Sequence, residues 1–208
     1  KAGNKGTGNW TTIASAELGV PSTLIASALF SRYTSFYKEE RVLLNKNFEN
    51  VNNSELNIST QEVLEAYQFA RIINHYQGFK LISEASHKSN WNLNLSEIAR
   101  IWTNGCIIRS SLMEDLVEVF KETTNILTNS ELIQLVKKYK PSAKKVVSES
   151  ILNDITTPAL SESLQFLNGI TTEYASANVI QAQSDYFGAH TYKRLDDDSE
   201  KSYHTNWN

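Results

Sequence analysis

Apolar residues recur every three or four positions along most of the chain, which is the periodicity of an amphipathic helix. The pattern is clearest between residues 61 and 87. Ser59 stands three residues before Glu62, a capping-box arrangement that satisfies backbone amides at a helix start. The sequence therefore predicts a helix over about residues 61–87. Its apolar stripe consists of Val63, Leu64, Tyr67, Ala70, Ile73, Tyr76 and Phe79.

Residues that start and stop helices divide the remainder of the chain. Gly19 ends a first short helix, and Pro21 suits the first turn of the next element. Ser96, Ser130 and Ser142 are candidate N-caps for later helices. The predicted helices cover residues 10–18, 21–45 with a candidate break near 33–34, 96–102, 106–122, 130–139, 142–154 and 157–187.

No run of residues alternates between apolar and polar over the length of a strand, so the sequence predicts an all-α fold. We expect long antiparallel helices over residues 1–187, because only three prolines and eight glycines interrupt the chain. Residues 188–208 form a polar tail that includes the aromatic residues Tyr203 and Trp207. A segment this hydrophilic does not bury itself alone, so its aromatic rings are expected to need a partner surface.

Composition excludes several classes of function. The 208 residues carry a net charge of -3, without the basic excess of a general nucleic-acid binder. The single cysteine, Cys106, excludes an internal disulfide and a cysteine-based zinc site, and it suits a reducing compartment. The longest apolar stretch, residues 24–30, is too short to span a membrane. The chain begins with Lys1 rather than Met, so we expect a further part upstream.

Few residues suggest a functional site when the sequence is read by itself, without comparison to a known family. Lys5 and Thr7 stand among glycines in a loop whose amides suit an anion, although such a loop is more often a plain turn. Arg32 lies in an apolar helix, where an ordinary ion pair is favoured over an anion site. The histidines have no metal-pair spacing, so no metal site is expected. His190 follows the last predicted helix, a position that can present a side chain to a ligand.

Three blocks of sequence resemble 6-phosphogluconate dehydrogenases and span nearly the whole chain in that family's order. The first is KGTGNWT at residues 5–11 with LGVP at 18–21, and the second is IWTNGCIIRS at 101–110. The third joins ANVIQAQ at 177–183, DYFGAHTY at 185–192 and HTNW at 204–207. The resemblance implies the later part of the family's helical domain and its C-terminal tail.

The family converts 6-phosphogluconate to ribulose 5-phosphate by oxidative decarboxylation with NADP, in the cytoplasm. Its subunits have an N-terminal Rossmann domain, and the C-terminal tail threads through the other subunit of a homodimer. The resemblance therefore implies that the Rossmann domain, most of the NADP site and the catalytic acid and base lie outside this chain. We expect this chain alone to be inactive.

The resemblance also implies roles for individual residues. Lys5, Thr7 and Arg32 match residues that hold the substrate phosphate, and His190 matches one that the partner subunit contributes. Ser184 stands where the family usually has a phosphate-binding Arg, which predicts weaker binding of 6-phosphogluconate because a hydroxyl brings no charge. Two alternatives stay open: a helical dimerisation module whose site has decayed, and a related dehydrogenase for another sugar acid.

Overall fold

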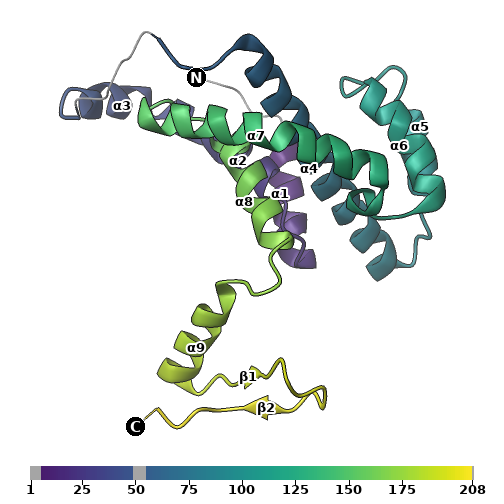
Figure 1. Cartoon of the computed structure of the whole chain (residues 1–208), viewed down its shortest axis with the longest axis vertical. Coiled ribbons are helices and arrows are strands. Elements are labelled where there is room, and N and C mark those ends of the chain that lie inside the picture. The colour runs from purple at the N-terminus through teal and green to yellow at the C-terminus, as the bar shows by residue number, and fades with distance from the viewer. Residues whose placement is uncertain (1–5, 49–54, 208) are drawn as a thin grey trace. The chain divides into compact units, whose positions relative to one another are not determined.

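The computed structural model describes residues 6–48 and 55–207, and the prediction of an all-α fold is confirmed (Figure 1). The chain divides into two compact units, Lys1–Leu167 and Asn168–Asn208. The helices are α1 (Thr7–Leu18), α2 (Thr23–Phe36), α3 (Lys38–Asn45), α4 (Thr60–Ser89), α5 (Leu95–Ile101), α6 (Ser111–Glu122), the 3-10 turn η1 (Ile126–Thr128), α7 (Ser130–Leu152), α8 (Pro158–Ile170) and α9 (Ala177–Gly188).

The first unit is centred on the two longest helices, α4 and α7. Lys145 on α7 donates to Glu62 at the start of α4 over 2.7 Å, and Ser142 bonds Glu65 one turn further along α4. The order of these contacts makes the two helices antiparallel. The largest fully buried apolar side chains of the unit form its core: Phe69, Ile73, Met113, Leu116, Ile126 and Leu132.

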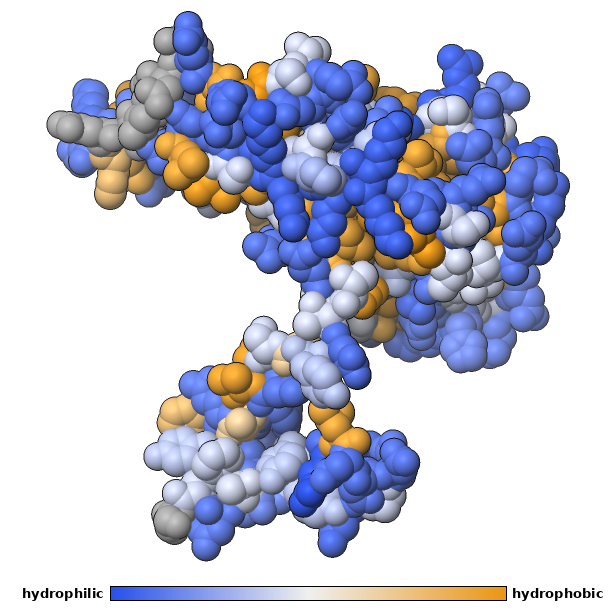
Figure 2. All heavy atoms as spheres, viewed as in Figure 1, coloured by the Kyte–Doolittle hydropathy of each residue, from blue (hydrophilic) through white to orange (hydrophobic). Residues whose placement is uncertain are grey.

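The start of α4 agrees with its prediction, but three of the seven residues of the predicted apolar stripe are exposed. Ser59 and Glu62 form the capping box. Val63, Leu64 and Tyr67 are 43%, 49% and 55% exposed, whereas Ala70 is partly buried and Ile73, Tyr76 and Phe79 are buried. Apolar residues also reach the surface at α3, where Figure 2 shows them beside hydrophilic residues. The spacing of apolar residues thus identifies the apolar face of a helix, but it does not show which residues of that face are buried by other helices.

The helices α1 and α2 form a hairpin at Gly19, whose φ of 67° is the left-handed turn expected there. Both predicted boundaries shift: α1 begins at Thr7, and α2 begins after Pro21 with Ser22 as its N-cap residue. The break between α2 and α3 lies at Tyr37, not near residue 33.

Two predicted caps, Ser96 and Ser130, are wrong because neighbouring residues take the role. Asn129, not Ser130, caps α7 by accepting from the amides of Glu131 and Leu132. Asn94, not Ser96, caps α5 by accepting from the Glu97 amide, while the Ser96 hydroxyl donates to the Val117 carbonyl of α6. The predicted helix 106–122 begins only at Ser111, capped by Ser110, since residues 106–109 form a turn. An N-cap therefore depends on which polar side chain faces the helix end, not on spacing alone.

The predicted helices 130–139 and 142–154 are one continuous helix, α7, which contains Pro141. Ser142 is therefore not a cap; its hydroxyl bonds Glu65 on α4 instead. Ala143, Val146 and Val147 beyond the proline are buried in the core. Contact with α4 on both sides of Pro141 outweighs the helix-breaking tendency of proline.

The predicted helix 157–187 is likewise wrong, because α8 ends at Ile170 and α9 starts at Ala177. Beyond α9, the tail forms two short antiparallel strands, β1 (Tyr192–Lys193) and β2 (Ser202–Tyr203). The rings of Tyr192 and Tyr203 stack across this pair with centroids 6.3 Å apart. The tail therefore supplies part of its own packing surface.

Candidate functional site

A cavity of about 1030 Å³ opens among α1, α2, α4 and the start of α8 in the first unit. Thr7 and Arg32, two residues singled out from the sequence, both line it. Lys5 lies outside the described residues. The lining consists of Thr7, Gly8, Leu24, Ile25, Ala28, Leu29, Arg32, Tyr67, Ala70, Arg71, Asn74, Ala159 and Leu160.

Thr7 is the first residue of α1, and the backbone there is shaped by glycine. Gly6 precedes the helix with a φ of 91°, a left-handed conformation that glycine adopts without strain. Among the described residues, no side-chain cap is found at this end of α1, where the N-cap residue is Gly6. The first amides of a helix have no acceptor within the helix, and the helix dipole is positive there. The Thr7 hydroxyl and these amides together favour an anion at this edge of the cavity.

Arg32 is exposed on α2, and the start of α2 is fixed by a buried glutamine of α4. The Gln77 side chain accepts from the Leu24 amide over 3.1 Å and donates to the Thr23 hydroxyl over 3.0 Å. Ser15 and Ser22 add a 2.5 Å hydroxyl contact between α1 and α2. These bonds set the position of the helix that carries the Arg32 guanidinium.

The structure adds Arg71 and Asn74, which sequence reasoning missed, to the same cavity. Arg71 donates to Gln68 over 3.2 Å and lies 5.5 Å from the centre of the Tyr67 ring. The sequence contained one sign of this role. Arg71 follows Tyr67 by four residues, so it lies on the helix face that we predicted to be apolar, where a charged residue is unusual. Arg32 and Arg71 make the polar part of the cavity cationic.

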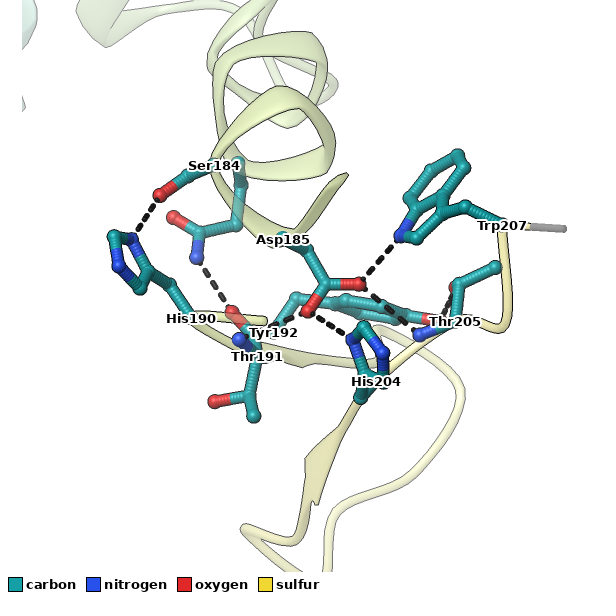
Figure 3. A network of polar contacts seen from close by, with 9 residues as sticks. Ser184, Asp185, His190, Thr191, Tyr192, His204, Thr205 and Trp207 are labelled. Carbon is teal, nitrogen blue, oxygen red and sulfur yellow. Dashed lines mark hydrogen bonds and ion pairs between the residues drawn. The ribbon is translucent and has the colours of Figure 1, made fainter. Parts of the chain in front are cut away.

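Ser184 of α9 and His190 of the tail, both singled out from the sequence, contact each other in the second unit. The Ser184 hydroxyl of α9 lies 2.8 Å from Nδ1 of His190 (Figure 3). His190 is exposed and follows Ala189, whose φ of 50° ends the helix in a left-handed turn. The structure thus brings Thr7 and Arg32 together in one unit, and Ser184 and His190 together in the other.

Asp185 is a second residue that sequence reasoning missed, and it organises the tail. Its buried carboxylate accepts from the Thr191 amide, His204 Nδ1, the Thr205 amide and Trp207 Nε1 over 2.9–3.0 Å (Figure 3). Burial alone would raise the pKa of Asp185, but the hydrogen bonds from His204, Thr205, Trp207 and Thr191 outweigh burial and lower it. The carboxylate therefore stays ionised and ties the chain end to α9.

The described residues 6–48 and 55–207 contain no cluster of three or more histidine, cysteine or acidic residues that suits a metal ion. In the same part of the chain, no helix combines the length and apolar character needed to cross a bilayer. A dinucleotide phosphate site of the usual kind needs a strand, a glycine-rich turn and a helix in succession. The strands of the described part are β1 and β2, which form only a hairpin, so these residues do not fit the core of a dinucleotide site.

Comparison with known proteins agrees with this arrangement of helices and tail. Residues 1–207 match the family model described as 6-phosphogluconate dehydrogenase, C-terminal domain. The chain belongs to the 6-phosphogluconate dehydrogenase family. The resemblance proposed from the three sequence blocks is therefore confirmed.

Individual members of the family show the extent of the likeness. A 6-phosphogluconate dehydrogenase, decarboxylating, from Staphylococcus epidermidis is 37% identical over 212 residues, which cover 99% of this chain and 45% of the relative. The protein of that name from Ceratitis capitata is 40% identical over 213 residues, which cover 99% of this chain and 44% of the relative. This chain therefore spans less than half of the length of these relatives.

A solved structure shows the same fold. The Plasmodium falciparum 6-phosphogluconate dehydrogenase superposes with a TM-score of 0.90 at 36% identity, over 99% of this chain and 45% of that one. That enzyme was determined in its apo form, with its cofactor NADP+ and with its substrate 6-phosphogluconate.

Proposed function

We propose that this chain is the substrate-binding and dimer-forming part of an enzyme that oxidatively decarboxylates 6-phosphogluconate to ribulose 5-phosphate with NADP. The observation that carries the proposal is the cavity whose lining includes both Thr7, at the start of α1, and Arg32 of α2. Family membership supports the same reaction, and a cytoplasmic location is part of the proposal.

The cavity suits the phosphate end of the substrate. A guanidinium binds phosphate oxygens in pairs, and hydrogen bonds to a charged group are stronger than neutral ones. Arg32 would supply that contact, with the Thr7 hydroxyl and the first amides of α1 as further donors. Arg71 would add a second positive charge, which favours a dianion. Lys5 stays a predicted ligand of the same phosphate.

The chain alone is expected to bind substrate without turning it over. Among the described residues, those that line the cavity include no carboxylate, lysine or histidine that would act as acid or base. The reaction needs a hydride acceptor, which is the chemistry that NADP supplies when bound. Because the described residues do not form the core of a dinucleotide site, we propose that other parts of the enzyme hold NADP and the catalytic acid and base.

We further propose that the enzyme works as a homodimer in which His190 enters the partner subunit's cavity. Asp185 holds the tail residues around His190 to α9, so the second unit presents the imidazole at a defined place. An imidazole N–H is a suitable donor to a phosphate oxygen. Ser184 contributes no charge to that contact, so the expectation of weaker phosphate binding stands as part of the proposal.

The test is an assay of the complete gene product with 6-phosphogluconate and with each nicotinamide cofactor. Replacing Arg32 with Met should raise the Michaelis constant by about 10- to 150-fold, the range for a lost charge-assisted contact. Arg100→Met is the matched control, because Arg100 pairs on the surface with Glu97 and does not line the cavity.

The assay also separates the two alternative functions. Ribulose 5-phosphate formation that depends on Arg32 contradicts a decayed dimerisation module. Preferential turnover of a sugar acid without a phosphate would contradict the phosphate role of the cavity. If Arg32→Met and Arg100→Met bind 6-phosphogluconate equally well, the proposed site is wrong.

A further inference from the structure

The imidazole of His190 is held against α9 from two directions. Ser184 lies 2.8 Å from Nδ1 on one side. On the other side is Gly188, where a Cβ atom would lie 2.6 Å from Nε2 and 3.0 Å from Cδ2 of the ring. Real Cβ atoms do not approach other atoms so closely, so the ring occupies this place only because residue 188 is glycine.

The backbone that carries His190 is fixed as well. The Thr191 amide donates to Asp185 over 2.9 Å, and the Thr191 carbonyl accepts from Gln181 over 2.6 Å. Ala189 and Thr191, on either side of His190, have φ values of 50° and 63°. Because both bonds lead back to α9, the turn has little freedom, and the remaining freedom of His190 is rotation of its own side chain.

We propose that Ser184 is a positioning residue that orients the His190 imidazole for the substrate phosphate, an inference that rests on the proposed function. When the imidazole is neutral, a Ser184 hydroxyl that donates to Nδ1 leaves the proton on Nε2. When the imidazole is charged, the same hydroxyl accepts from the Nδ1 proton. In both of these arrangements Nε2 carries a proton, so it is a donor for a phosphate oxygen. The proposal excludes the third arrangement, in which a neutral imidazole donates from Nδ1 to the hydroxyl and Nε2 has no proton.

A hydroxyl at position 184 is suited to this task because it both donates and accepts. A side chain that only donates would support the neutral imidazole alone. Ser184 therefore acts through His190, not by its own contact with the phosphate. Substrate binding should then depend on the hydroxyl group and on the space above Gly188.

The experiment compares steady-state kinetics of the complete gene product and its Ser184 variants with 6-phosphogluconate. Ser184→Ala should raise the Michaelis constant about 2- to 12-fold, the range for one lost hydrogen bond, with kcat unchanged. Ser184→Thr keeps the hydroxyl and should restore the wild-type constant. Gly188→Ala should imitate Ser184→Ala, because the added methyl group displaces the ring. Ser148→Ala, on the exposed side of α7, is the control.

A second readout follows His190 itself, through the ¹⁵N chemical shifts of its ring in the same proteins. The shifts should report a proton fixed on Nε2 in the wild type and a mixture of tautomers in Ser184→Ala. A folding defect would lower kcat through the active fraction and leave the Michaelis constant unchanged.

Different results would contradict the positioning role of Ser184 and the proposed function. If the wild type turns over 6-phosphogluconate and Ser184→Ala has the same Michaelis constant, the positioning role is wrong and the function stands. If the wild type does not turn over the substrate, the proposed function fails. Unchanged His190 shifts in Ser184→Ala would in either case overturn the contact on which the inference depends.

Discussion

Gln77 is the residue whose replacement best tests how the fold positions the cavity. Its side chain is fully buried and joins α4 to the start of α2 through the Leu24 amide and the Thr23 hydroxyl. Leu is similar in volume to Gln, so Gln77→Leu removes both bonds without leaving a large cavity. The buried Leu24 amide then loses its acceptor, whereas the half-buried Thr23 hydroxyl can bond water.

The expected loss of stability follows from that amide. A buried donor left without an acceptor costs about 1–3 kcal/mol. For a unit of this size, each kcal/mol lowers Tm by about 2–4 °C, so Gln77→Leu should melt about 2–12 °C below the wild type. The Michaelis constant for 6-phosphogluconate should also rise, because α2 carries Arg32.

Thermal unfolding followed by circular dichroism measures the change in Tm. Gln134→Leu is the matched control, since Gln134 is exposed on α7 and its replacement should change stability by less than about 0.5 kcal/mol. If Gln77→Leu has the same Tm as the wild type, the hydrogen bonds of Gln77 do not hold α2 in place, and the explanation of how the cavity is positioned is refuted.

Further predictions concern pH, the tail and the substrate. The hydrogen bonds of Lys145 and Ser59 lower the pKa of Glu62 from 4.5 to about 2. A lowered pKa stabilises the fold above pH 4.5, and this contribution is lost between pH 4.5 and about 2. The Tm difference between wild type and Glu62→Gln should therefore shrink over that interval; a constant difference would contradict it. Asp185→Asn should speed amide exchange at Thr205 by about tenfold or more, because the carboxamide offers one acceptor where the carboxylate offers two. Unchanged exchange would show that Asp185 does not hold the tail. Ser184→Arg should lower the Michaelis constant for 6-phosphogluconate, since it adds a charge; no decrease would count against a phosphate near residue 184.

Local signals in the sequence predicted a helix end correctly where residues next to that end determine it. The capping box of Ser59 and Glu62 and the turn at Gly19 are of this kind. Predictions failed where contacts between helices determine the helix boundaries. Pro141 is an example: it lies inside α7 because residues on both sides of it pack on α4. The stripe on α4 failed in part for the same reason: periodicity does not tell what covers Val63 and Tyr67.

The candidate site was predicted from the resemblance, not from local chemistry. An ion pair was the favoured reading of Arg32 until matched motifs placed it with Thr7, and the structure brings both to one cavity. Arg71 was missed because a single arginine on an apolar face has no pattern of its own. Asp185 was missed because its partners are spread over residues 191–207, and only the folded tail brings them together.

The central claim is that one phosphate is bound by Arg32 of one subunit and His190 of the other. A mixed dimer tests this directly, by combining an Arg32→Met chain with a His190→Ala chain. If His190 crosses to the partner, one of the two cavities in the mixed dimer has both wild-type residues. The mixed dimer should then show about half of the wild-type kcat per dimer at the wild-type Michaelis constant, although each parent dimer binds substrate weakly. A mixed dimer as impaired as its parents would place both residues of a site on one chain and contradict the account.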